Sequence, residues 1–181
     1  IDKRYVGSEL GTYKDDAITK VSADGKILFQ KSVSNIFIEN NLMFLLFSSG
    51  ENVFMQDPLH LNDIQPVMTD GPYWKRGDVF LSLRQLSMII LYRPSTNKII
   101  WRGGTEHTML QQHDVDILDD HRISIFNNKA YSLIDDNKVD GHNQIVIYDF
   151  NKDSYSKYLD ESLEQYDVRT VSAGSSQILD S

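Results

Sequence analysis

The chain has 181 residues, 40% of them hydrophobic and 24% charged, which is enough for one globular domain with a hydrophobic core. Its net charge of −8 and the lack of any Lys/Arg run argue against nucleic acid, because neutralising phosphates requires a basic patch. The absence of cysteine excludes disulfides, thiolate metal sites and a cysteine nucleophile, and no apolar stretch reaches the roughly 18 residues of a membrane span.

Short hairpins recur along the chain and suggest β-structure. Each consists of two strands around turn residues such as Asp-Gly, Pro or Asn, and they are expected at residues 17–30, 88–101 and 144–158. Apolar side chains cluster without clean alternation in residues 35–47, which predicts a helix, and a shorter helix is expected over 160–166. Helix content should therefore be low.

A second repeated unit lies between the hairpins. The pattern His-x-x-Asp-Ile occurs at residues 60–64 and again 53 positions later at 113–117. Each copy precedes an alternating strand, at 78–84 and 122–128, and a weaker third copy begins at Gln177. Four short strands per unit are typical of a propeller blade. We therefore predict an all-β chain with about three blades of four-stranded antiparallel sheet, and with His60 and His113 at matching positions in adjacent blades.

The number of repeats predicts an incomplete ring. Closed propellers usually have about 4–8 blades, and the third copy stops at Ser181. The chain also begins at Ile1 without methionine and without a visible signal peptide. We expect residues 1–181 to form a single, partial β-propeller domain, a fragment of a longer protein.

Several short polar and aromatic motifs follow one another from residue 57 to the end. They are His60-x-Asn62, Ser82-x-Arg84, Ile99-x-Trp101-x-Gly103-Gly104, Gln112-His113-Asp114 and Phe126-Asn127-Asn128. Each motif alone is weak, but their order and spacing resemble the bacterial arylsulfotransferase (aryl-sulfate sulfotransferase) family.

The resemblance implies a six-bladed propeller, often periplasmic or secreted. It also implies transfer of a sulfuryl group from a phenolic sulfate ester to a phenol through a sulfated histidine, without a nucleotide donor or other cofactor. By motif, His113 takes the place of the nucleophile, His60 and Arg84 join it as catalytic residues, and Asn62 and Thr170 are expected to bind substrate. The family pattern includes a further histidine upstream of His60, and the first 59 residues contain none.

The chemistry of these residue types agrees with sulfuryl transfer. A neutral imidazole is a competent nucleophile near neutral pH, and a guanidinium provides a planar, permanently charged fork for anionic oxygens. The Asn62 amide can donate to the same oxygens, and a protonated His60 can donate to the departing phenolic oxygen. We expect Asp114 or Asp116 to orient the His113 ring.

Other interpretations of the same residues stay open. Repeated histidines in propellers can simply bond a neighbouring loop, which would leave a non-catalytic binding module, and a hydrolase or lyase could use the same groups. Residues 135–140 resemble a calcium-binding cluster but lack EF-hand spacing, and His60 with His113 have no evident third ligand, so no metal is predicted. The remaining histidines, His107, His121 and His142, are expected at solvent. The identities of donor and acceptor and the oligomeric state are not indicated.

Overall fold

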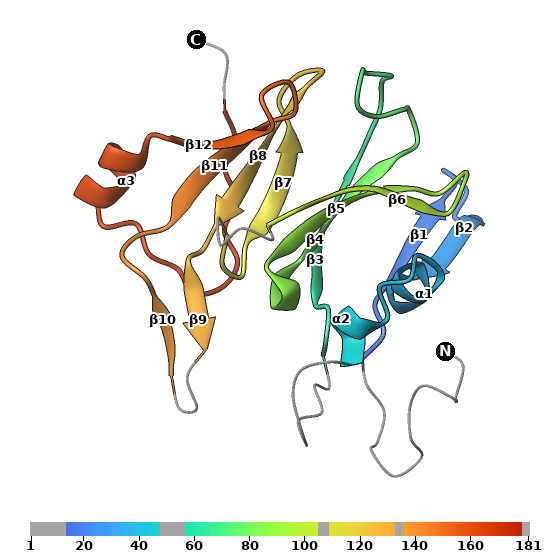
Figure 1. Ribbon diagram of the computed structural model, residues 1–181, viewed down its shortest axis with the longest axis horizontal. Coiled ribbons are helices and arrows are strands. Elements are labelled where there is room, and N and C mark those ends of the chain that lie inside the picture. Colours follow the sequence, from blue (N-terminus) through green and yellow to red (C-terminus); the bar gives the residue numbers. More distant parts are fainter. Residues whose placement is uncertain (1–13, 48–56, 105–108, 133–135, 179–181) are drawn as a thin grey trace.

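A computed structural model describes residues 14–47, 57–104, 109–132 and 136–178, and most of their regular structure is antiparallel sheet (Figure 1). The first four-stranded sheet contains β3 (Leu61–Pro66), β4 (Val79–Leu83), β5 (Met88–Arg93) and β6 (Lys98–Gly103). The second contains β7 (His113–Ile117), β8 (Arg122–Asn127), β11 (Gln144–Asp149) and β12 (Ser154–Tyr158). In both sheets the strands lie side by side in chain order, as in successive propeller blades. The predicted all-β class is confirmed.

A third, two-stranded sheet joins β1 (Ala17–Val21) to β2 (Ile27–Ser32), so all three predicted hairpins are present. The apolar stretch after β2 forms α1 (Val33–Glu39) and α2 (Phe44–Phe47), and α3 (Asp160–Gln165) follows β12. Ser32 starts α1 because its Oγ accepts from the Asn35 N–H at 3.0 Å. Among the described residues, no helix is long and apolar enough to cross a membrane.

Two stretches differ from the sequence-based expectation. The stretch that includes residues 135–140, for which no strand is predicted, contributes to a small hairpin of β9 (Ala130–Ser132) with β10 (Asn137–Val139). Its strands are three residues long and mostly exposed, so they carry no alternation that could reveal them. In the weak third repeat, Gln177 and Ile178 lie outside any strand, and the repeat's remaining residues lie outside the described part.

Successive side chains of β4 and β5 point to opposite faces of the sheet, so the core has two halves. Phe80 and Leu91 pack toward the second sheet, whereas Leu81 and Ile90 pack toward α1 and the first hairpin. Trp101 on β6 is half-buried and packs against the half of the core shared by the two large sheets. The first large sheet is therefore covered on both faces, and its strands are held rigidly.

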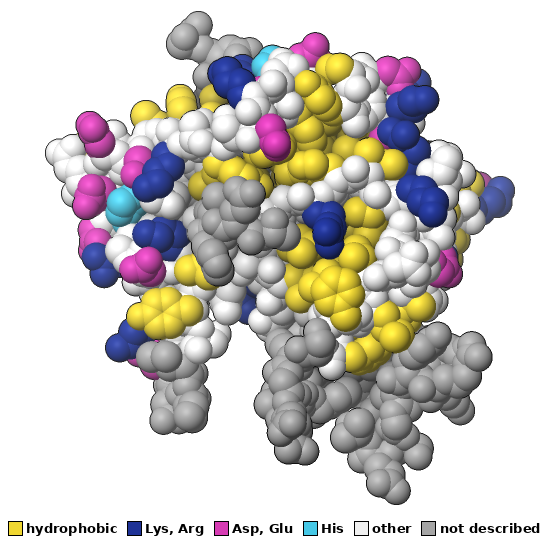
Figure 2. Space-filling model, viewed as in Figure 1, with side chains coloured by type: hydrophobic (Ala, Val, Ile, Leu, Met, Phe, Trp, Pro, Cys, Tyr) yellow, Lys and Arg dark blue, Asp and Glu magenta, His cyan; other side chains and the backbone are white. Residues whose placement is uncertain are grey.

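The surface mixes side chains of all kinds. Figure 2 shows hydrophobic side chains mainly over the middle of one face, with lysine and arginine spread mostly around its margin.

Figure 1 shows the two large sheets side by side, with β3 and β7 at the centre where they meet. The Val115 N–H on β7 donates to Asp63 Oδ2 on β3 at 2.9 Å, which fixes the two strands against each other. The beginnings of β3 and β7 carry the predicted site.

Candidate functional site

The predicted site residues come from two neighbouring sheets. His60 immediately precedes β3 and His113 opens β7, so both histidines stand at the beginning of the first strand of a sheet. Arg84 follows β4 at the start of a short 3₁₀ turn (Arg84–Leu86), and its backbone N–H donates to the His60 carbonyl at 3.1 Å. Since β4 runs antiparallel to β3, its end returns to the point where β3 begins.

Asn62, on β3, bonds the first sheet to the residue that precedes His113. Its Nδ2 donates to the Gln112 carbonyl at 2.8 Å, and its Oδ1 is buried without a hydrogen-bond partner among the described residues. Asn62 is expected to bind substrate through its side-chain amide, and one N–H of that amide is already donated to Gln112. The buried oxygen is an acceptor that a hydroxyl donor could satisfy.

Both ring nitrogens of His113 are hydrogen-bonded. Nδ1 lies 2.7 Å from Asn128 Oδ1, and Nε2 accepts from the Ala173 N–H at 3.2 Å. The expectation that Asp114 or Asp116 orients the ring is wrong. Asp114 has a positive φ of 54° at the bulge of β7, and its Oδ2 accepts from the Ser176 N–H at 2.7 Å.

The surroundings of His113 favour the neutral imidazole. Burial is the main cause that lowers its pKa below the ordinary value, and the positive charges of Arg84 and His60 lower it further. The hydrogen bonds with the Asn128 side chain and with the Gln111 backbone act in the opposite direction and are outweighed. The Arg84 guanidinium is bonded to Gln111, two residues before His113, and the Arg84 backbone to His60.

Arg84 has an unused donor. Its Nη2 donates to Gln111 Oε1 at 2.6 Å, whereas its Nε is buried and has no hydrogen-bond partner among the described residues. A buried N–H without an acceptor is costly, by about 1–3 kcal/mol. An anionic oxygen placed beside this guanidinium would remove that cost.

His60 has a carboxylate partner that the motif comparison missed. Asp57 Oδ2 lies 2.6 Å from His60 Nδ1, and both side chains are partly exposed. Such a carboxylate holds the ring in one orientation. The only feature of the sequence that points to this contact is an acidic residue three positions before the histidine.

A comparison with known families assigns the chain to one of them. The family model described as Arylsulfotransferase (ASST) matches residues 3–181, almost the whole chain. The chain belongs to the arylsulfotransferase family. No curated protein and no solved structure matches it.

Thr170 reaches His113 indirectly. Its hydroxyl, expected to contact substrate, donates to the Ser172 carbonyl at 2.5 Å. Its own carbonyl accepts from Asn128 Nδ2 at 3.1 Å. Thr170 thus belongs to a segment, residues 170–176, that passes beside His113 and is bonded to the ring and to Asn128.

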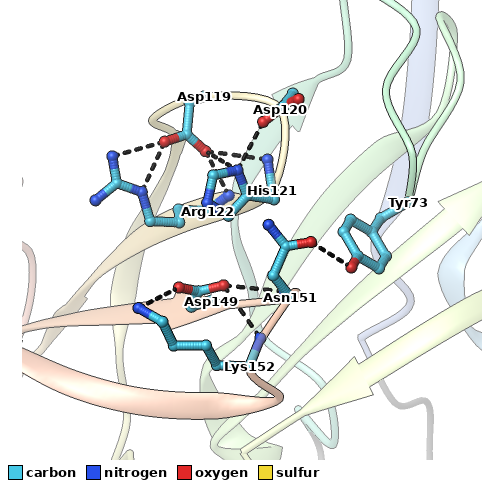
Figure 3. A network of polar contacts seen from close by, with 8 residues as sticks. All are labelled: Tyr73, Asp119, Asp120, His121, Arg122, Asp149, Asn151 and Lys152. Carbon is cyan, nitrogen blue, oxygen red and sulfur yellow. Dashed lines mark hydrogen bonds and ion pairs between the residues drawn. The ribbon is translucent and has the colours of Figure 1, made fainter.

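The opposite end of β7 carries a separate polar cluster, drawn in Figure 3. The ligand atoms of Asp119, Asp120 and His121 are close enough together to hold a metal ion. The Asp119 carboxylate, however, already accepts from the Arg122 guanidinium at 2.6 Å and from two backbone N–H groups. These contacts close the β7–β8 turn.

The other histidines have partners or lie outside the described residues. His142, expected at solvent, is only 12% exposed, and its Nε2 lies 3.0 Å from Asp160 Oδ1. That contact joins the loop before β11 to the start of α3, which explains the burial. His121 is also partly covered, between Asp119 and Asp120. His107 lies outside the described residues.

Proposed function

We propose that this chain transfers a sulfuryl group from a phenolic sulfate ester to a phenol through a covalent sulfohistidine at His113. The observation that carries the proposal is the buried Nε–H of Arg84, which has no partner among the described residues and belongs to a guanidinium bonded to Gln111, two residues before His113; burial also lowers the pKa of His113, which favours its neutral imidazole. The Nε–H is a donor for an anion and the imidazole is a nucleophile. Family membership supports the same chemistry.

In the first step, His113 Nε2 attacks sulfur, the N–S bond forms and the bond from sulfur to the phenolic oxygen breaks. The leaving phenolic oxygen takes a proton from His60, whose ring Asp57 holds from the Nδ1 side. The Arg84 guanidinium stabilises the charge on the sulfuryl oxygens, as cationic clamps do in phosphoryl transfer.

In the second step, the hydroxyl oxygen of the acceptor phenol attacks sulfur and the N–S bond breaks. Neutral His60 takes the phenol's proton, so the enzyme returns to its starting protonation state. Both steps balance without any cofactor. We also infer from family membership that the two sheets are successive blades of one propeller and that the protein acts in the periplasm or outside the cell.

The test is to incubate the full chain with para-nitrophenyl sulfate and a phenol acceptor, measuring nitrophenol release and intact mass. The wild type should release nitrophenol and gain the mass of one sulfuryl group, which peptide analysis should locate on His113. His113→Ala should lose both signals. His121→Ala, at the other end of β7, should retain both and serves as the matched control.

The competing function is a binding module that has lost the chemistry. It predicts that aryl sulfate binds while no adduct and no turnover are detected in the wild type. That result, or undiminished turnover in His113→Ala, would overturn the proposal.

A further inference from the structure

Asn128 occupies a central position behind His113. It is fully buried, and its side chain makes three hydrogen bonds, one to the His113 ring and two to backbone carbonyls. It lies just beyond β8, 15 residues from His113 in the sequence. The chemistry proposed above assigns no role to this residue.

The hydrogen bonds of Asn128 define which way its amide faces. Nδ2 donates to the Thr170 carbonyl at 3.1 Å and to the Ala173 carbonyl at 2.8 Å. Reversing the amide would place its oxygen against two carbonyl oxygens, which is unfavourable. The oxygen must therefore face the His113 ring, and because this oxygen can only accept, His113 Nδ1 must carry a hydrogen.

A contact at Nε2, on the other side of the ring, independently indicates the same tautomer. The Ala173 backbone N–H lies 3.2 Å from His113 Nε2 and can only donate. A backbone donor requires a lone pair on its partner, so Nε2 is unprotonated. Two contacts from opposite sides thus agree that Nδ1 is protonated and that Nε2 carries the lone pair, which accepts from the Ala173 N–H and can act as the nucleophile once that hydrogen bond gives way.

We propose that Asn128 is a positioning residue that holds His113 in the Nδ1–H tautomer and so directs sulfuryl transfer to Nε2. This inference rests on the proposed function. Asn128 also fastens residues 170–176, and so it places the Ala173 N–H beside the reacting nitrogen. When the Nε2 lone pair forms the N–S bond, this N–H is left beside the new group and can donate to a sulfuryl oxygen.

Asn143 provides a matched control, because it holds the same segment without a hydrogen bond to His113. Its Oδ1 accepts from the Thr170 N–H at 2.6 Å, and its Nδ2 donates to the Thr170 carbonyl at 3.0 Å. It is also fully buried. Its Nδ2 also donates to the Asn128 backbone carbonyl at 2.7 Å. Asn143→Ala should therefore loosen the segment and lower stability while keeping the Asn128 side chain, whose two other hydrogen bonds hold its oxygen toward His113 Nδ1.

The experiment combines nitrogen-15 NMR of the histidine rings with the rate of sulfohistidine formation from para-nitrophenyl sulfate. Wild-type His113 should show a protonated Nδ1 and an unprotonated Nε2 at neutral pH. In Asn128→Ala, the ring should populate both tautomers, and adduct formation should slow by about 10- to 100-fold, as for outer-shell partners of metal-bound histidines. Asn143→Ala should keep the wild-type tautomer and should slow the reaction less.

A wild-type ring protonated on Nε2 would overturn the inference, even if Asn128→Ala does not fold. So would an Asn128→Ala protein that keeps both the wild-type tautomer and the wild-type rate. The NMR signature needs no turnover, so its outcome is separate from that of the proposed function. If the wild type forms no adduct, the proposed function fails, while the tautomer is still measured.

Discussion

Replacing Arg84 with Met should remove most of the sulfuryl transfer without weakening the fold. Methionine keeps an apolar stem of similar length but has no guanidinium to stabilise the sulfuryl oxygens. Loss of one donor aimed at developing negative charge typically slows catalysis by about 10²- to 10³-fold, or roughly 2.7–4 kcal/mol. We expect a fall of that size in the rate of nitrophenol release.

The stability of the same variant should change little, because two effects oppose each other. Arg84→Met removes the hydrogen bond to Gln111, which is worth about 1.5–3 kcal/mol for a charged donor. It also removes the buried, unpartnered Nε–H, which costs the folded protein about 1–3 kcal/mol. The two offset to within about 1 kcal/mol, so the melting temperature should stay close to that of the wild type.

Arg93 is the matched control in the same sheet. It donates through Nε and Nη2 to the Asp78 carboxylate at 2.8 and 2.7 Å, and Asp78 is 2% exposed. Arg93→Met leaves that buried charge unpaired, which should cost about 3–5 kcal/mol of stability while the folded fraction keeps its activity. The reasoning is wrong if Arg84→Met turns over normally, or if it loses as much stability as Arg93→Met.

Two further predictions concern pH and the segment beside His113. The rate of sulfohistidine formation should rise with pH through the pKa of His113, because only the neutral ring attacks. In rapid-mixing measurements, the midpoint of this rise should lie below pH 6.5, the ordinary pKa of histidine, because burial lowers the pKa of His113. Arg84→Met should move the midpoint upward, because it removes a nearby positive charge. A wild-type midpoint above pH 6.5 would contradict this prediction. Gly174→Ala should lower both stability and the sulfation rate, because its φ is +113° and a Cβ would lie 2.4 Å from the Phe126 ring. Gly25→Ala, where φ is +82° and no atom lies within 4 Å of a Cβ, should show the backbone strain alone and leave the rate unchanged.

The sequence by itself was enough to predict the sheets. Period-two alternation and turn residues are local signals, and they located the hairpins, the copies of His-x-x-Asp-Ile and the low helix content. They also placed His60 and His113 at the beginnings of neighbouring sheets, because the same repeat folds the same way each time. The small β9–β10 hairpin was missed because its short, exposed strands have no hydrophobic pattern to detect.

The partners of the site residues were decided only by the tertiary structure. A carboxylate next to His113 was the natural candidate to orient the ring, but the left-handed backbone at Asp114 turns that side chain to Ser176. Asn128 takes its place from beyond the neighbouring strand, and Ala173 comes from 60 residues further along the chain. Contacts of this kind depend on how strand ends and loops converge, which no local pattern encodes. The sequence thus determined which residues open the strands, whereas only the folded chain determined which ring nitrogen of His113 is free to react.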